Sequence, residues 1–150
     1  MARAHFTVRE VEALIPTLEQ IFVHVLQLRA GLRALGAKLD RAGVRMTSEA
    51  SDDSLETESG PPAVRQAKAV FRGLDEALTD ELARVTEVGG EIKDVEMGLV
   101  DFPGLRSGEE ILLCWKLGEK RVAYWHSVDG GFASRRPIDA EVATAAPRLD

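Results

Sequence analysis

Residues 78–102 read LTDELARVTEVGGEIKDVEMGLVDF, and the spacing of the apolar residues changes in the middle of this stretch. Up to Val88 the apolar residues recur at steps of three and four, which is the period of one face of an α-helix. Gly89 and Gly90 interrupt this pattern, and glycine commonly follows the last turn of a helix. Beyond them the apolar residues gather in short runs that are typical of β-strands. The chain is therefore predicted to pass from helix to sheet near Gly90.

Before this point, a heptad pattern predicts a long helix over residues 8–42. Thr7 followed by Glu10 is a capping box, in which each side chain bonds a backbone amide at the start of the helix. The apolar residues then alternate steps of three and four over about four heptads: Val11, Leu14, Leu18, Ile21, Val25, Leu28, Leu32, Leu35 and Leu39. Such a seam requires a partner helix along its length.

The partner is predicted to begin at Pro61 and Pro62, because proline suits the first turn of a helix. Its apolar seam consists of Ala67, Phe71, Leu74, Leu78, Leu82, Val85 and Val88. The two seams together predict an antiparallel, coiled-coil-like helical hairpin over residues 7–89. The connection at 43–60 is acidic and poor in apolar residues, so we expect it to be a mobile loop.

After the hairpin, a β-rich part is predicted at 91–139 as a small antiparallel sheet. Its expected strands are 92–95, 99–102, 111–117 and 122–126, with a turn at 118–121. A turn of two or four residues places His126 on the same face as Ile111, Leu113 and Trp115, whereas a three-residue turn reverses the faces of the last strand. We expect a flexible tail at 140–150. The whole chain, 1–150, is thus predicted to be a single α+β domain.

Charge and composition exclude several classes of protein. Of the formal net charge of −6, five negative charges lie between residues 47 and 60, so the rest of the chain is almost neutral. Without a stripe rich in Lys and Arg, nucleic acid is not an expected partner. No run of about 18 apolar residues is present, so no membrane span is expected. The one cysteine, Cys114, cannot form an internal disulfide, which favours a cytoplasmic location.

The β-rich part contains the candidate ligand or metal site. Its members are four carboxylates and one imidazole: Asp94, Glu96, Asp101, His126 and Asp129. Such a set could hold a divalent ion such as Mn, Zn or Fe, or could act as general acid and base. The alternative, which we favour, is structural: Asp101 and Asp129 cap turns, Glu96 is solvated, and His126 makes one hydrogen bond. No cofactor is indicated beyond a possible divalent metal.

Arg135 and Arg136 have a functional and a structural interpretation. Arg135 and Arg136 follow the turn at 129–131 and could bind an anion with its amides. We favour an internal ion pair of Arg135 with Asp94 or Asp101 instead.

Lys93 could be a base with a lowered pKa, although a solvated lysine is the favoured interpretation. Cys114, in the middle of a strand, is expected to be a small buried apolar residue rather than a nucleophile.

Several short strings in the last third of the chain occur in a distinctive order. They are Ile92-Lys93-Asp94, Gly98-Leu99-Val100-Asp101-Phe102-Pro103, Leu113-Cys114-Trp115-Lys116-Leu117-Gly118-Glu119, Tyr124-Trp125-His126, Asp129-Gly130-Gly131-Phe132 and Arg135-Arg136-Pro137. With the Phe6-Thr7 helix start, they resemble the prokaryotic family catalogued as domain of unknown function 2203. The resemblance covers nearly the full chain. It implies a single-domain bacterial protein and brings no activity, substrate or cofactor.

Two hypotheses for function follow. The leading one is a non-enzymatic interaction or small-ligand-binding module that forms a homodimer through its helices. It rests on apolar residues beside the two seams: Ile15, Phe22 and Leu26 in the first helix, and Val64 and Val70 in the second. The alternative is a metal-dependent or acid/base enzyme with its carboxylate and histidine site on the small sheet.

Overall fold

The computed structural model describes residues 5–46 and 60–144. These residues form two long helices followed by a five-stranded antiparallel sheet, which confirms the predicted α+β class with a helical hairpin. The chain divides into two compact units, one of Met1–Phe22 with Ala83–Asp150 and one of Val23–Leu82. Each helix is divided between the two units. The boundary between the units in sequence therefore does not coincide with Gly90, where the spacing of the apolar residues changes. Most of the predicted acidic loop at 43–60 lies outside the described residues.

Helix α1 (Val8–Arg41) begins at the predicted capping box. The backbone amide of Thr7 donates to Glu10 Oε1 at 2.9 Å, and the amide of Glu10 donates to Thr7 Oγ1 at 3.2 Å. These two bonds satisfy amides that have no partner inside the helix.

The start of α1 is also held by the end of the described chain. The amides of Val8 and Arg9 donate to the carbonyls of Ala143 and Thr144 at 3.1 and 2.9 Å. Val142 is buried and forms a bridge with Arg106. Within the segment predicted as a flexible tail, the carbonyls of residues 143 and 144 thus act as acceptors for the helix start; residues 145–150 lie outside the described part.

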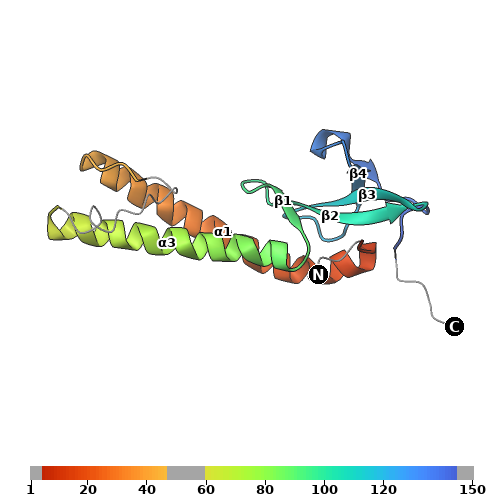
Figure 1. Cartoon of the computed structure of the whole chain (residues 1–150), viewed down its shortest axis with the longest axis horizontal. Coiled ribbons are helices and arrows are strands. Elements are labelled where there is room, and N and C mark those ends of the chain that lie inside the picture. Colours follow the sequence, from red (N-terminus) through yellow and green to blue (C-terminus); the bar gives the residue numbers. More distant parts are fainter. Residues whose placement is uncertain (1–4, 47–59, 145–150) are drawn as a thin grey trace. The chain divides into compact units, whose positions relative to one another are not determined.

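Helix α3 (Pro62–Glu87) is the predicted partner. In the unit of Val23–Leu82 it lies beside α1 (Figure 1). There Leu74 and Phe71 of α3 lie next to Gly31 and Gly36 of α1. A Cβ at either glycine would lie 3.4 to 3.5 Å from these side chains, which is ordinary contact distance, so packing against α3 does not require glycine there. At the other end, Gly89 has a φ of 99° and ends the helix in the left-handed conformation.

The five strands pair in chain order, each antiparallel to the next. They are β1 (Glu91–Asp94), β2 (Leu99–Arg106), β3 (Glu109–Lys116), β4 (Tyr124–Ser127) and β5 (Arg136–Pro137). The first four correspond to the predicted strands, with shifted ends. The two-residue strand β5 and the short 3₁₀-helix η1 (Phe132–Ser134) were not predicted.

The register of β4 differs from the first of the two predicted arrangements. His126 lies opposite Leu112, and Trp125 lies opposite Leu113. Directly opposed residues share a face, so His126 is on the face of Leu112 and not on that of Leu113. The predicted strand began too early: the amide of Val122 donates to Glu12 Oε2 of α1 at 3.1 Å, and β4 begins only at Tyr124.

One face of the sheet, here called the helix face, carries Val100, Phe102, Leu113 and Trp115, all buried. It packs against the ends of the helices that belong to the same unit. The ring of Phe22 lies 6.2 Å from Trp115, and that of Phe6 lies 5.3 Å from Phe102. Close packing also explains Gly90, because a Cβ there would approach Val100 to 2.7 Å. The hydrophobic core of this unit is therefore on the helix face.

Among the described residues, α1 is the one helix that is long and apolar enough to cross a membrane by length and composition alone. The sequence analysis, in contrast, expected no segment able to span a membrane. Core helices of folded proteins pass the same test. A third of the apolar window, 33%, is buried, and the first half of α1 buries Val11, Leu18 and Phe22 completely.

Candidate functional site

The opposite face of the sheet, here called the cluster face, carries Asp101 on β2, Cys114 on β3 and His126 on β4. Asp101 lies opposite Cys114, and His126 lies two residues beyond Tyr124, the partner of Cys114 on β4. Because alternate residues of a strand point to the same side, the three side chains converge. One donor atom from each lies within 4.8 Å of the others. We refer to these three residues as the cluster.

The hydrogen bonds of His126 define its orientation. Nδ1 lies 2.8 Å from the carbonyl oxygen of Ser127, and Nε2 lies 3.0 Å from Asp101 Oδ2. A carbonyl can only accept, so Nδ1 carries a hydrogen and donates it. The bond between Nε2 and Asp101 then contains one proton, on either the imidazole or the carboxyl group. In both cases the net charge of the pair is zero.

The cluster is almost completely shielded from solvent. Cys114, Asp101 and His126 are 0%, 1% and 2% exposed. Within the described part of the chain, Asp101 Oδ1 is buried without a hydrogen-bond partner. Leaving a buried polar atom unsatisfied costs about 1–3 kcal/mol. Apart from an interaction between the Cys114 thiol and Asp101, which raises the pKa of the thiol, the cluster therefore offers an acceptor oxygen without a hydrogen bond.

Cys114 is not placed to act as a nucleophile. Burial, together with the negative charge of Asp101, raises the pKa of its thiol to about 12, although Arg135 acts in the opposite direction. Both ring nitrogens of His126 already have partners, so neither is free to take the thiol proton. The arrangement supports the expectation that Cys114 is no catalytic thiol, but it adds a sulfur donor to the cluster.

Arg135 lies beside the cluster and is engaged on several sides. Its guanidinium donates to the carbonyl of Cys114 at 3.0 Å and to Glu119 Oε1 at 2.6 Å. It also stacks over the rings of Tyr124 and Phe132, with centroid distances of 4.1 and 4.8 Å. Burial acts to lower the pKa of Arg135, but the bond to Glu119 raises it, and the net direction is upward. Arg135 is therefore a charged, fixed neighbour of Cys114.

The predicted internal ion pair of Arg135 exists, but its predicted partners are wrong. Asp94 and Asp101 were expected, and Glu119 is found. Glu119 lies in the loop between β3 and β4, where it also accepts from the backbone amide of Lys116 at 2.8 Å. The loop lies beside Arg135 because of the way in which β4 pairs with β3. This register cannot be predicted from the local sequence.

Arg136 does not join Arg135 in a common anion site. Its guanidinium lies 5.5 Å from the ring of Trp125, whereas that of Arg135 lies over Tyr124. Arg135 ends the 3₁₀-helix η1 and Arg136 begins β5, and the two guanidinium groups lie over different rings. Asp129 is exposed on the turn that follows β4.

The remaining candidates lie at the other edge of the sheet. Asp94 Oδ1 accepts from the amide of Met97 at 2.9 Å and so caps the turn between β1 and β2. Glu96 is exposed in the same turn. Lys93 donates to Glu91 at 2.8 Å, and this bond raises the pKa of Lys93, which is unsuited to a general base. Of the five predicted site residues, the structure thus brings Asp101 and His126 together and adds Cys114.

Comparison with known proteins gives one family. The sequence model of the family described as "uncharacterized conserved protein" (DUF2203) matches residues 4–138. No curated protein and no solved structure matches the chain. The matched span contains both helices, all five strands and the three residues of the cluster.

Proposed function

The chain belongs to the DUF2203 family, whose description gives no activity, and we propose that it is a non-enzymatic module that binds one transition-metal ion of the zinc type. The ligands are Asp101, Cys114 and His126. The observation that carries the proposal is the convergence of a carboxylate, a thiol and an imidazole within 4.8 Å, with one buried carboxylate oxygen left unsatisfied.

The donor set favours this class of metal. Cysteine sulfur, histidine nitrogen and aspartate oxygen are all zinc ligands, and a thiol selects against magnesium and calcium. The separation of 3.0 Å between His126 Nε2 and Asp101 Oδ2 is close to the roughly 3.3 Å expected of two ligands on a tetrahedral ion with bonds of about 2.0–2.1 Å. A small adjustment would therefore bring both onto one ion.

The surroundings of His126 support the same function. Histidines that bind a metal through one ring nitrogen usually donate from the other to a carbonyl or carboxylate. The bond from Nδ1 to the Ser127 carbonyl is of this kind, and it directs Nε2 into the cluster. A bound ion would take Nε2 as a ligand in place of its present bond with Asp101.

Charge balance also favours a divalent ion. A carboxylate and a thiolate together carry two negative charges, which neutralise a divalent cation in a buried site. The adjacent Arg135 is already neutralised by Glu119. The loaded site would thus bury no net charge.

The burial of the cluster favours binding over catalysis. Three protein ligands leave one position of a tetrahedral ion open, and catalytic zinc sites use such a position for water and substrate. The three ligands here are only 0 to 2% exposed, so a substrate has no access to that position. The alternative, a metal-dependent or acid/base enzyme, is therefore less well supported by this geometry.

A cobalt titration tests the metal site. Metal-free protein should bind Co(II) at one site and develop the near-ultraviolet charge-transfer absorption of a thiolate bound to cobalt. Cys114→Ser, which preserves the shape of the side chain, should lose this band. Glu96→Gln, which changes a carboxylate outside the cluster, should behave as wild type. Identical spectra for wild type and Cys114→Ser would refute the site.

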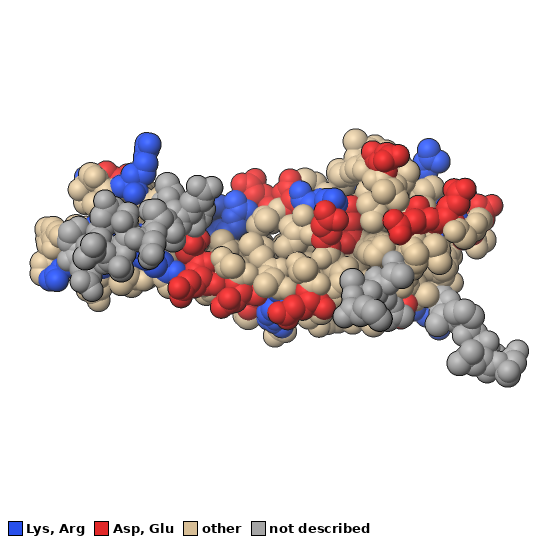
Figure 2. All heavy atoms as spheres, viewed as in Figure 1, with Lys and Arg blue, Asp and Glu red and all other residues tan. Residues whose placement is uncertain are grey.

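Location and partners belong to the same proposal. The free buried thiol of Cys114 suits a reducing compartment, which favours the cytoplasm. On the face shown in Figure 2, the Lys and Arg side chains of the described residues lie scattered among acidic ones. This pattern supports the expectation that nucleic acid is not a partner.

A further inference from the structure

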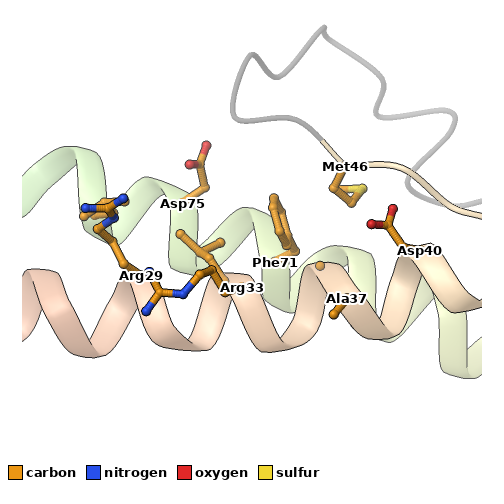
Figure 3. A pocket seen from close by; sticks show the side chains of 10 residues that line it. Arg29, Arg33, Ala37, Asp40, Met46, Phe71 and Asp75 are labelled. Carbon is orange, nitrogen blue, oxygen red and sulfur yellow. The ribbon is translucent and has the colours of Figure 1, made fainter. Parts of the chain in front are cut away.

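The unit of Val23–Leu82 has an apolar groove between its two helices. The groove has a volume of about 550 Å³, and Figure 3 shows its lining. Apolar residues line its inner surface: Leu32, Gly36 and Ala37 from α1, Phe71 and Leu78 from α3, and Met46. Charged side chains border it: Arg29, Arg33 and Asp40 from α1, and Asp75 from α3.

Helix α1 is more apolar than one partner helix can cover. Of its most apolar 18-residue window, 33% is buried. Two of the apolar residues that the sequence placed beside the seam, Ile15 and Phe22, are buried within the chain. Leu26 and Val70 are instead 39% and 49% exposed, so part of the hairpin surface remains apolar.

Two of the four charged side chains that border the groove, Arg33 and Asp40, are placed symmetrically about a small centre. Arg33, Ala37 and Asp40 of α1 all line the groove and are labelled in Figure 3. Their spacing of four and then three residues keeps them on one helix face. The two opposite charges are about 10 Å apart along the axis, at about 1.5 Å per residue. Midway between them lie the small residues Gly36 and Ala37.

We propose that a second copy of this chain occupies the groove, with a two-fold axis passing near Gly36 and Ala37. Helix α1 of one copy then runs antiparallel to α1 of the other. Arg33 of each copy faces Asp40 of its partner, so both pairs form at once, as a two-fold interface requires. The small residues at the crossing let the two helices approach closely.

Self-complementarity is the reason to choose a second copy over another partner. On this surface a positive and a negative side chain lie on opposite sides of a small apolar centre. When a second copy is rotated by 180° about that centre, its negative side chain faces the positive one of the first copy, and the reverse. This matching of opposite charges favours one register of the pair, because other registers separate Arg33 from Asp40 of the partner copy.

Charge reversal tests the pairing. In sedimentation equilibrium, wild type should dimerise, and Arg33→Asp or Asp40→Arg alone should weaken the dimer about tenfold by placing like charges opposite each other. The double variant Arg33→Asp/Asp40→Arg should recover wild-type affinity. A monomeric wild type, or a double variant as weak as the single ones, would overturn the proposal.

Disulfide trapping tests the axis independently of charge. Ala37→Cys places a thiol next to its own copy across the axis and should form a cross-linked dimer on mild oxidation. Ala69→Cys, exposed on α3 outside the lining of the groove, is the matched control and should remain largely uncross-linked. Cross-linking of the Ala69 variant but not of the Ala37 variant would exclude this arrangement.

Discussion

His126 Nε2 lies 3.0 Å from Asp101 Oδ2, and both side chains are buried. The two residues are 25 positions apart in sequence. Removing one partner leaves the other polar and buried. Asp101→Ala should therefore lower the free energy of unfolding by about 3 kcal/mol in metal-free protein. Asp101→Asn should cost less, because its amide can still donate to Nε2. Urea denaturation measures both, and equal stability of wild type and Asp101→Ala would contradict the buried pair.

Metal binding should release protons. The proton shared by Asp101 and His126 and the proton of the Cys114 thiol must both leave when the three side chains bind one ion, which gives about two protons per ion near neutral pH. Affinity should accordingly rise with pH. Calorimetric titrations with Zn(II) in buffers of different ionisation enthalpy measure the count. Binding without proton release would place the metal elsewhere.

The Cys114 thiol should react slowly in the folded, metal-free protein. Its pKa of about 12 keeps it protonated at neutral pH, and the thiolate is the reactive form. Iodoacetamide should modify Cys114 much more slowly in native protein than in urea. Equal rates under the two conditions would show that the thiol is not buried.

The same shift predicts a loss of stability at alkaline pH. The unfolded chain loses the thiol proton near pH 9, whereas the folded chain holds it to about pH 12, so the unfolded state binds fewer protons in this window. Stability should therefore fall as pH rises between these values. The stability difference between wild type and Cys114→Ala should shrink over the same range. An unchanged difference would contradict the shifted pKa.

Arg135 and Arg136 should differ in their effect on stability although they are neighbours. Arg135 is bonded to Glu119 and the Cys114 carbonyl and is stacked on two rings, so Arg135→Ala should cost about 2 kcal/mol. Arg136 is exposed, and Arg136→Ala should cost less than about 1 kcal/mol. Thermal unfolding of the two variants compares them directly, and equal losses would count against the role given to Arg135.

Local patterns predicted the elements of this fold but not all of their pairings. The capping box at Thr7 and the change of period at Gly90 are short-range signals, and both correspond to element boundaries. Val122, just before β4, donates to Glu12, which is 110 residues away in sequence. No short stretch of sequence contains that information.

The same limit applies to the candidate site. Asp101 and His126 were predicted because carboxylate and imidazole chemistry is visible in sequence. Cys114 was set aside, since a cysteine in the middle of a strand is usually just a small buried residue. Its place opposite Asp101 follows from strand pairing, and only the pairing shows that its side chain points to the same face. The anchoring of residues 140–144 at the start of α1 was missed for the same reason.

The zinc-edge X-ray absorption spectrum of zinc-loaded wild-type protein tests the central claim most directly. Ligation by Cys114, His126 and Asp101 predicts one sulfur at about 2.3 Å, with nitrogen and oxygen ligands at about 2.0–2.2 Å. The sulfur contribution should disappear in Cys114→Ser. A wild-type spectrum with only nitrogen and oxygen ligands would contradict metal binding at the cluster.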